Sequence, residues 1–377
     1  MQYTEYELGE LLPFEQPTAY IVKSTDYSDA YATPVLTAGK SFILGKANET
    51  DGIFDQLPVI IFDDFTTATQ FVNFRFKVKS SAMKILHINT DLVIPKYIFY
   101  RLQIIQFDHS THKRYWIQSY SKIKVLIPPL DEQFRIVASI EELFSELDKV
   151  VGTLKTTKEQ LEVYRQAVLK DAFSDFEKKD SIRNLTMVVT SGSRGWAKYY
   201  SNSGALFVRI GNLTHSGIDI DFRNIQHITP PDNAEGVRTR LQPNDVLVSI
   251  TADLGSIGFV SEKVEEAYIN QHIALVRFQN PVQGRFMAWY LRSEYGQKDL
   301  LKNKRGGGKL GLGLDDIRDT PVPIVDDITA KEIVDKVEEQ LSVCDSIEKT
   351  VDTALTQADA MRQSILKQAF EGKKDVY

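Results

Sequence analysis

The chain has 377 residues, of which 42% are hydrophobic and 25% charged, and its formal net charge is −6. This is an ordinary globular composition with enough apolar residues for two or three domains. The single cysteine, Cys344, excludes a disulfide within the chain and fits a reducing compartment. The first residues lack the basic start and apolar run of a signal peptide. No stretch approaches the ~20 apolar residues of a membrane helix, so we expect a cytoplasmic protein.

Acidic residues are concentrated in two stretches of the chain. Residues 131–177 carry a net charge of −5 and residues 326–371 carry −6, which leaves +5 for the remainder. The distribution of charge matters more for the choice of partner than the sum does. The mildly basic remainder is therefore compatible with an anionic partner such as DNA, although it does not by itself indicate one.

Residues 1–130 are predicted to form a mixed, strand-rich domain. The apolar run 57–62 is typical of a buried strand, and residues 74–79 alternate apolar and basic side chains as a half-exposed strand does. Residues 97–102 are typical of a short, aromatic-rich helix. A polar, basic stretch and a further strand complete the domain.

Residues 131–177 are predicted to form one long helix. The prolines at 128 and 129 block its extension backwards, and Asp131 and Glu132 suit a helix N-terminus, where negative charge meets the positive end of the dipole. Apolar residues recur at alternating spacings of three and four, as in the seam of a coiled coil. The predicted seam in this helix includes Ile140, Leu147, Leu154 and Leu161.

Residues 178–323 are predicted to form a second mixed domain of similar length. Residues 205–210, 245–250 and 273–278 are predicted strands, and glycine, proline and asparagine separate them. Residues 286–291 are typical of a short, aromatic-rich helix. As in the first domain, a basic stretch, a strand and a proline-containing junction follow.

Residues 324–377 are predicted to form the second long helix. Pro321 and Pro323 precede it, and Gly372 is a plausible end. Its apolar residues repeat with the same phase as those of the first helix. The predicted seam in this helix includes Val337, Cys344, Val351 and Met361.

An internal repeat relates the two halves of the chain at an offset of 197 residues. Residues 165–173, RQAVLKDAF, match residues 362–370, RQSILKQAF. We therefore predict an α+β fold with two mixed α/β domains separated by two long antiparallel helices, which form a coiled coil with pseudo-two-fold symmetry. In the alternative, each apolar stripe packs on its own domain. Against it, a helix of about 40 residues is roughly 60 Å long, which exceeds the diameter of such a domain.

Basic residues are mixed with aromatic residues or glycines in loops of both domains. Glycine lets the backbone approach a phosphate, cations neutralise it, and Arg, Gln and Asn can read base edges. One such loop alone is more often an ordinary solvated turn, but recurrence at equivalent distances before the two junctions favours DNA as the partner. The predicted DNA-binding residues are Lys113, Arg114, Tyr115, Gln118 and Ser119 in the first domain and Arg194, Lys198, Lys302, Lys304, Arg305, Gly307 and Lys309 in the second.

Catalytic and metal-binding motifs are not evident in the sequence. His109 and His112 lack the companions of a zinc site, and the glycines at 306–308 lack the spacing of a phosphate-binding loop. The adjacent acids Asp63 and Asp64 fit a strand end and turn better than a pair of nuclease carboxylates. There is no Asn/Asp-Pro-Pro-Tyr/Phe motif of the amino-methyltransferases. We therefore expect no metal, no cofactor and no catalysis by this chain.

Several motifs together resemble one known family. They are the junction IPPLDEQ at 127–133, the repeated helix ends LKDAF at 169–173 and LKQAF at 366–370, and residues 62–67 with 78–83. On these motifs the chain resembles the specificity subunits of type I restriction-modification enzymes over nearly its whole length. The second junction, at 322–327, departs from the first, so the resemblance of the second half depends more on the repeat.

The resemblance implies two target-recognition domains, each reading one half of a bipartite sequence in double-stranded DNA. It also implies that the helices set the unread spacer and dock modification subunits, two in number, which bind S-adenosylmethionine and methylate adenine. Restriction subunits would add ATP-driven translocation and cleavage. One alternative is a non-catalytic coiled-coil scaffold that presents two binding modules to protein partners. A third, weaker possibility is an enzyme in its own right. A DNA affinity that falls with rising salt concentration would distinguish a specificity subunit from the scaffold.

Overall fold

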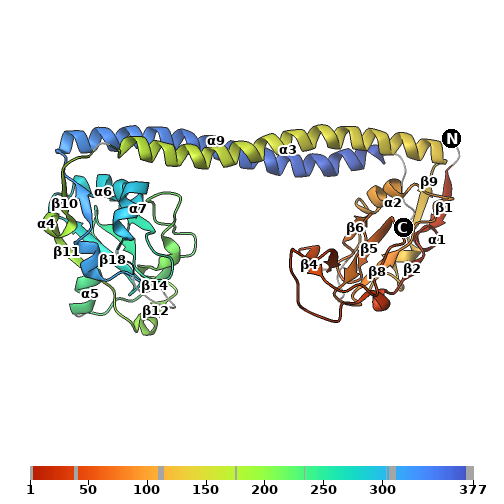
Figure 1. The fold of residues 1–377 in the computed structure, drawn as a ribbon, viewed down its shortest axis with the longest axis horizontal. Helices are drawn as coiled ribbons and strands as arrows, with labels where there is room; N and C mark the ends of the chain where they lie inside the picture. Colours follow the sequence, from red (N-terminus) through yellow and green to blue (C-terminus); the bar gives the residue numbers. More distant parts are fainter. Residues whose placement is uncertain are drawn as a thin grey trace. The chain divides into compact units, whose positions relative to one another are not determined.

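The structure, a computed structural model, describes residues 3–37, 41–108, 114–174, 176–232, 234–302, 304 and 311–370. The chain divides into two compact units (Figure 1). The first consists of residues 1–154 with 353–377, and the second consists of residues 155–352. Each unit therefore combines a globular domain with one half of each long helix. Within the described parts of the chain, no helix is sufficiently long and apolar to span a bilayer.

The first unit contains a four-stranded antiparallel sheet in the order β2-β8-β5-β6 and a three-stranded sheet in the order β4-β3-β7. Strand β5 is buried throughout, as its uninterrupted apolar sequence predicts. The elements are β1 Thr4–Glu7, α1 Leu8–Leu11, β2 Phe14–Glu15, η1 Pro17–Tyr20, β3 Thr33–Leu36, β4 Ile43–Ala47, β5 Val59–Asp63, β6 Thr69–Val72, β7 Lys77–Val78, β8 Met83–Leu86, α2 Pro95–Leu102, η2 Tyr120–Lys122 and β9 Lys124–Ile127.

The second unit contains two four-stranded sheets, in the orders β11-β18-β15-β16 and β12-β14-β13-β17. Strand β15 lies at the centre of its sheet and is buried. The elements are β10 Lys179–Ser181, α4 Ile182–Leu185, β11 Thr186–Ser191, η3 Trp196–Tyr199, β12 Tyr200–Ser201, β13 Ala205–Val208, η4 Ile210–Asn212, β14 Gln226–Ile228, α5 Ala234–Thr239, β15 Val246–Ser249, β16 Ile257–Phe259, β17 Ala267–Ile269, β18 Ile273–Phe278, α6 Gln283–Arg292, α7 Glu294–Leu300, α8 Leu314–Arg318 and β19 Pro321–Pro323.

The two domains share one topology. The order β2-β8-β5-β6 corresponds to β11-β18-β15-β16, with antiparallel pairing at every step. The parallel pair β3·β7 corresponds to β13·β17, and the antiparallel pair β1·β9 at the base of the first domain corresponds to β10·β19. The repeat found in the helix sequences therefore extends to the domains.

The long helices are α3, Leu130–Ala172, and α9, Asp327–Ala369. Each helix ends several residues before the last residue of the segment predicted for it, 131–177 for α3 and 324–377 for α9. In the first unit, Arg362 of α9 pairs with Asp148 of α3, and in the second unit Arg165 of α3 pairs with Asp345 of α9. In each unit, the late half of one helix thus contacts the early half of the other, as antiparallel packing requires.

The repeated helix ends insert into the domain cores. Leu169 and Phe173 belong to the core of the second unit, and Leu366 and Phe370 belong to the core of the first. Phe173 packs on Phe286 and Phe370 packs on Tyr97, with ring centroids 5.5 and 5.4 Å apart. Burial of these side chains explains why the Leu-Lys-x-Ala-Phe sequence occurs at both helix ends.

Only part of the predicted seam is buried. Ile140, Leu147, Leu161, Val337, Cys344 and Val351 are buried, and Leu154 is half-buried. Met361 is 54% exposed, so its assignment to the seam is wrong. Ala358 is buried and Arg362 lies four residues further on, where it pairs with Asp148. A helix turns about 100° per residue, so the positions three and four residues after Ala358 lie on opposite sides of it. Arg362, four residues on, lies on the side that contacts α3, and Met361, three residues on, lies on the other side.

Candidate nucleic-acid interface

One edge of the main sheet in the first domain gathers several loops. Strands β5 and β8 are antiparallel neighbours, with Asp63 opposite Met83, so β5 ends where β8 begins. Strand β6 also begins at this edge, because Thr69 lies opposite Phe62. The turn 64–68 and the segment 79–82 therefore lie together. A third segment joins them where the backbone N–H of Tyr115 donates to the carbonyl oxygen of Asp64, at 2.9 Å.

A buried ion pair holds this arrangement. The carboxylate of Asp64 lies 3.1 Å from Nζ of Lys84, and both side chains are almost completely buried. Oδ1 of Asp64 also accepts a hydrogen bond from the backbone N–H of Trp116, at 2.9 Å. Asp63 accepts from the backbone N–H of Phe65, at 3.0 Å. These contacts favour a structural role for Asp63 and Asp64 over a catalytic one. Both carboxylates are engaged in anchoring the turn and the segment that begins at residue 114.

The predicted residues of the first domain separate into exposed and buried ones. Arg114 and Gln118 are exposed, and the guanidinium of Arg114 lies 5.9 Å from the ring centroid of the exposed Phe65. Ser119 is half-buried and its hydroxyl donates to the carbonyl oxygen of Tyr115, at 3.2 Å. Tyr115 is only 5% exposed. Its ring packs against Phe107 in the core, at 5.0 Å between centroids, so its assignment to a DNA-contacting surface is wrong. Lys113 lies outside the described residues.

The second domain repeats this edge. Ser249 at the end of β15 lies opposite Ile273 at the start of β18, as Asp63 lies opposite Met83. The backbone N–H of Leu312 donates to the carbonyl oxygen of Ile250, at 2.9 Å. Leu312 follows Tyr115 by 197 residues and makes the equivalent bond. Both predicted basic loops therefore lead into a segment that is hydrogen-bonded to the turn after the central strand.

Arg194 and Lys198 are exposed on the loop that follows β11 at the same edge. Trp196 between them is buried, and it stacks on Phe207 with ring centroids 5.1 Å apart. The carboxylate of Glu235 accepts from the backbone N–H of Ser193, at 3.1 Å, and is paired with Arg238. The buried indole and this carboxylate fix the loop, so the two cations project from a defined backbone.

Lys302 and Lys304 are exposed after α7. Helix α7 is linked to the same edge because Nε2 of Gln297 donates to the carbonyl oxygen of Gly255, at 2.8 Å, in the turn between β15 and β16. The remaining predictions in this loop, Arg305, Gly307 and Lys309, lie outside the described residues. The structure thus places Arg194 and Lys198 at one edge of the main sheet of the second domain, and Lys302 and Lys304 follow a helix that is hydrogen-bonded to the same edge.

Sequence reasoning missed a polar chain at this edge. Nδ1 of His272 lies 2.5 Å from Oγ1 of Thr251, and Nε2 of Gln271 lies 2.9 Å from Nε2 of His272. His272 immediately precedes the predicted strand 273–278. The equivalent residues of the first domain, by strand register, are Ser81 and Ala82. The strand prediction could have located this segment, but only the register shows that it lies beside the turn after β15.

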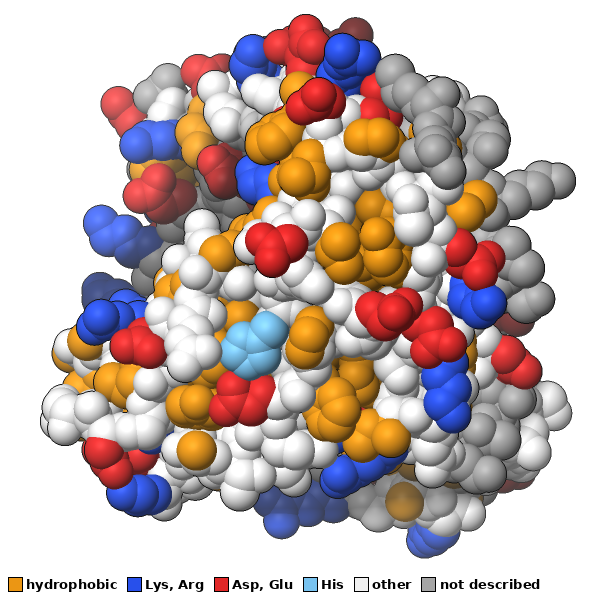
Figure 2. Space-filling view, turned by 90° about the vertical axis from the view of Figure 1, so that its right-hand side faces the viewer, with side chains coloured by type: hydrophobic (Ala, Val, Ile, Leu, Met, Phe, Trp, Pro, Cys, Tyr) orange, Lys and Arg blue, Asp and Glu red, His pale blue; other side chains and the backbone are white. Residues whose placement is uncertain are grey.

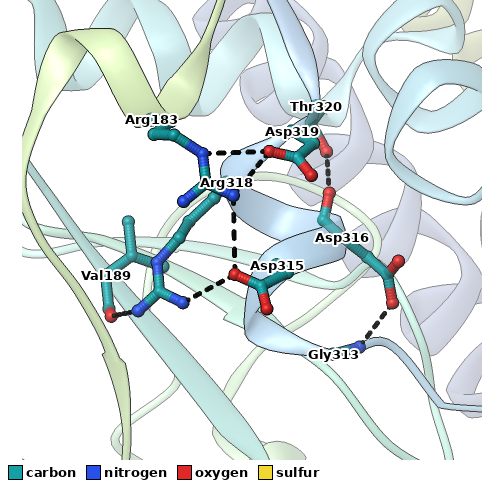
Figure 3. A network of polar contacts seen from close by, with 8 residues as sticks. All are labelled: Arg183, Val189, Gly313, Asp315, Asp316, Arg318, Asp319 and Thr320. Carbon is teal, nitrogen blue, oxygen red and sulfur yellow. Dashed lines mark hydrogen bonds and ion pairs between the residues drawn. The ribbon is translucent and has the colours of Figure 1, made fainter.

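A second network anchors the chain after the basic loop of the second domain (Figure 3). Nη2 of Arg318 in α8 donates to the carbonyl oxygen of Val189 in β11, at 2.8 Å, and Nη1 donates to Asp315, at 3.0 Å. Arg183 pairs with Asp319 at 2.7 Å, and Gly313 donates to Asp316 at 2.8 Å. Single exposed ion pairs contribute little, but this set ties α8 to the sheet on several sides.

The charges on the face of the first unit drawn in Figure 2 are mixed. Basic and acidic side chains alternate there around hydrophobic ones and do not separate by sign. Such a surface gives no strong field for steering an anion. The loop edge remains the better candidate for DNA on this domain.

The second half of the chain matches a known domain family. The family model described as the type I restriction modification DNA specificity domain covers residues 209–357. Among similar proteins, the Escherichia coli EcoR124I/EcoR124II specificity subunit is 45% identical over 174 residues, which cover 43% of this chain and 43% of that protein. The StySPI specificity subunit of Salmonella potsdam is 28% identical over 279 residues, covering 68% of this chain and 58% of that protein.

Solved structures share the fold over nearly the whole chain. A structure described as showing complex assembly and conformational transition of the type I R-M system has a TM-score of 0.71 at 17% identity, covering 99% of this chain and 98% of that one. The HsdS subunit from Thermoanaerobacter tengcongensis has a TM-score of 0.50 at 17% identity, covering 99% and 97%. At such identities the similarity establishes the fold. The matched segments span 43% to 58% of the curated proteins named above.

Proposed function

We propose that the chain belongs to the family of type I restriction-modification specificity subunits and that it recognises a bipartite sequence in double-stranded DNA. In this proposal residues 1–130 and 178–323 are two target-recognition domains, and each reads one half-site. The observation that supports the proposal is the repeated loop edge, in which equivalent backbone bonds from Tyr115 and Leu312 hold the segments that follow the two predicted basic loops beside the turn after the central strand.

The exposed residues at each edge have the chemistry that DNA requires. Arg194, Lys198, Lys302 and Lys304 in the second domain, and Arg114 in the first, are exposed cations that suit phosphate oxygens or guanine. Gln118 can pair with adenine in the major groove. We extend the proposal to Lys113, Arg305, Gly307 and Lys309 on sequence alone.

The two edges differ in the residues that they present. The second domain has the Gln271–His272–Thr251 chain where the first has Ser81 and Ala82. Direct reading of bases depends on the donors and acceptors that side chains offer. Two edges with one backbone plan and different side chains suit two different half-sites, and hence an asymmetric target.

The long helices carry an apolar stripe that suits a protein partner. Leu143, Val150 and Met361 in the first unit, and Tyr164 and Ile347 in the second, are 40–54% exposed. On α3, Leu143 and Val150 lie on the side of Ile140 opposite to Glu141 and Asp148, which line a groove shared with Phe99 and Tyr100 of α2. An exposed repeated stripe on a helix is typical of a surface that receives another helix. We assign this stripe to the docking of two modification subunits, one on each unit.

The chemistry of modification belongs, in this proposal, to those partners. They would bind S-adenosylmethionine and methylate adenine, while restriction subunits would supply ATP-dependent cleavage. This chain would supply the choice of sequence and the unread spacer between the half-sites. It would bind DNA and proteins, without a cofactor of its own.

Sequencing of methylated adenines in the host, with and without this gene, tests the proposal. We expect one bipartite, asymmetric motif to lose methylation when the gene is removed and to regain it when the gene is restored. An unchanged methylome would contradict it.

Salt-dependent binding provides the second measurement. We expect the affinity of the chain with its modification subunits for DNA to fall steeply as salt concentration rises. A flat response would favour the scaffold, because protein–protein docking of two modules does not release counterions from DNA.

A further inference from the structure

Three side chains at the loop edge of the second domain are joined by hydrogen bonds. Nε2 of Gln271 lies 2.9 Å from Nε2 of His272, and Nδ1 of His272 lies 2.5 Å from Oγ1 of Thr251. All three residues are partly exposed, so a ligand can reach them. We call these three residues the Gln–His–Thr chain.

The backbone under the Gln–His–Thr chain is held from several sides. Oδ1 of the buried Asn270 accepts from the backbone N–H of His272, at 3.1 Å. The carbonyl oxygen of His272 accepts from the backbone N–H of Ile250, at 2.9 Å. Gly192 approaches so closely that a Cβ there would lie 2.4 Å from the carbonyl oxygen of Ile269. Side chains on such a backbone are preorganised for a ligand.

Both basic segments of the second domain connect to the sheet next to this chain. Gly192, which packs against the backbone just before the chain, leads into the loop 194–198 with its exposed cations. A backbone bridge joins Thr251 to Gly311, which follows the predicted basic segment 302–309. Cations suited to phosphates therefore flank side chains that can contact a base, and DNA recognition uses both kinds of contact.

The directions of the two hydrogen bonds follow from the groups that make them. An amide nitrogen can only donate, so Nε2 of His272 accepts from Gln271. The imidazole then has its proton on Nδ1, which donates to Oγ1 of Thr251. The hydroxyl of Thr251 thus selects the tautomer of His272. That tautomer in turn holds the amide nitrogen, and not the amide oxygen, of Gln271 toward the ring.

The amide of Gln271 retains one acceptor and one donor for a ligand. Its nitrogen has two hydrogens and uses one of them for His272. Among the described residues, Oε1 has no hydrogen-bond partner. Adenine presents the N7 acceptor and the N6 donor in the major groove, and a glutamine amide matches both. Guanine presents acceptors at N7 and O6, so its O6 would face the oxygen of the amide.

We propose that Gln271 selects adenine at one position of the half-site read by the second domain, and that His272 and Thr251 are positioning residues that hold its amide in the orientation adenine requires. This inference rests on the proposed function. Without these partners the amide can turn over, which exchanges its donor and its acceptor and weakens the distinction between adenine and guanine. The first domain has Ser81 and Ala82 at the equivalent places, so this selection belongs to one half-site.

The test uses the full chain with its modification subunits and measures affinity for DNA by competition. Methylome sequencing supplies the native target, and the competitors have each of the other base pairs at every specified position. The wild type should prefer A·T to G·C at the position that Gln271 contacts. Gln271→Ala should lower that preference by roughly tenfold, as expected for the loss of a bidentate contact. Preferences at all other positions should stay within about twofold of the wild type.

Gln271→Glu should change the preferred base at the same position. A carboxylate has acceptors only, so it should repel N7 of adenine and accept from the N4 amino group of cytosine. We therefore expect the preference to change from adenine to cytosine. A loss of structure would weaken binding to every target and would not create a new preference.

Substitutions of the two positioning residues test how the amide is oriented. Thr251→Val keeps the shape of the side chain and removes the acceptor for Nδ1. It should lower the preference for adenine over guanine by roughly fivefold, as expected for the loss of one hydrogen bond. Thr251→Ser restores the hydroxyl and should restore the preference. His272→Phe keeps a ring without nitrogens and should lower the same preference at the same position.

The results distinguish this inference from the function on which it rests. If the wild-type complex prefers no sequence, the proposed function fails. If it is specific and Gln271→Ala keeps the preference at every position within about twofold, only the inference about Gln271 is overturned. It is equally overturned if the position that responds is guanine in the native target, because the amide would then be reversed. If Thr251→Val and His272→Phe both keep the preference that Gln271→Ala loses, their positioning role is overturned.

Discussion

Arg165 of α3 pairs with Asp345 of α9 at 2.6 Å, and the same pair recurs in the first unit as Arg362 with Asp148, each residue displaced by 197. The guanidinium of Arg165 also lies 3.0 Å from Glu348, and its side chain is 10% exposed. The chain thus places an arginine in the seam of both helix halves and satisfies it with acids of the opposite helix. An ion pair at such a position favours one register over others.

Replacing Arg165 by methionine should lower the free energy of unfolding of the second unit by ~1 kcal/mol, because Asp345 is well exposed and the pair is screened. A double-mutant cycle with Asp345→Asn, followed by thermal unfolding, measures the coupling directly. Arg362→Met is the matched variant and should have a smaller effect, since Arg362 is more exposed than Arg165. A larger loss for Arg362→Met would contradict this account.

Phe370→Ala should destabilise the first unit by ~3 kcal/mol or more, because the ring is buried against Tyr97 and its removal leaves a cavity. Hydrogen exchange measured by mass spectrometry would show faster exchange in the core of that unit alone. Phe173→Ala is the matched variant and should affect only the second unit. Met361→Ala, at an exposed position, should change stability by less than about 0.5 kcal/mol. Uniform loss of protection in both units would show that the ring is not a local anchor.

Lys84→Ala should destabilise the first domain by ~3–5 kcal/mol, because it leaves the buried carboxylate of Asp64 without its cation. The double variant Lys84→Met with Asp64→Asn should recover part of the loss, since neither residue then carries a buried charge. Urea unfolding of the wild type and of the two variants gives the comparison. If the double variant were as unstable as Lys84→Ala, the cost would come from packing rather than from the unpaired charge.

The sequence predicted the helices well because periodicity reports directly on amphipathic faces. Ile140 and Leu147 are buried where the repeat places them, yet Leu143 and Val150, which continue the same spacing of three and four along α3, are exposed. A spacing of three and four identifies apolar positions without saying which of them a partner within the chain covers. Tyr115 illustrates the converse error. Its basic neighbours suggested a surface residue, but the contacts of Asp64 with the backbone of Tyr115 and Trp116 turn the ring inward.

The repeat within the domains could not be seen in the sequence because its offset changes along the chain. It is 186 between Asp63 and Ser249 and 190 between Met83 and Ile273, and it reaches 197 only at Leu312. Loops of different length between equivalent strands produce this drift.

Ile347→Glu should weaken binding of a modification subunit at least tenfold, because it places a charge in the apolar stripe proposed as the docking surface. The stability of the free chain should change little, since the side chain is already 40% exposed. Titration calorimetry with the purified modification subunit measures the affinity. Lys155→Glu, at an exposed polar position on α3, is the control and should bind as the wild type does. Equal affinities for both variants would exclude the stripe as the docking surface.

Arg194→Ala with Lys198→Ala should weaken DNA binding and also make it less dependent on salt. Both side chains are exposed on a loop that Trp196 and Glu235 hold in place, so their removal should leave the fold intact. Each lost phosphate contact lowers the slope of log affinity against log salt by ~0.9. The double variant should therefore have a slope smaller by up to about 1.8 on the cognate target. A pair of base contacts would instead reduce the preference for the cognate half-site and leave the slope nearly unchanged. Measuring both quantities on cognate and scrambled DNA assigns the two cations to phosphates or to bases, and no change in either removes this loop from the interface.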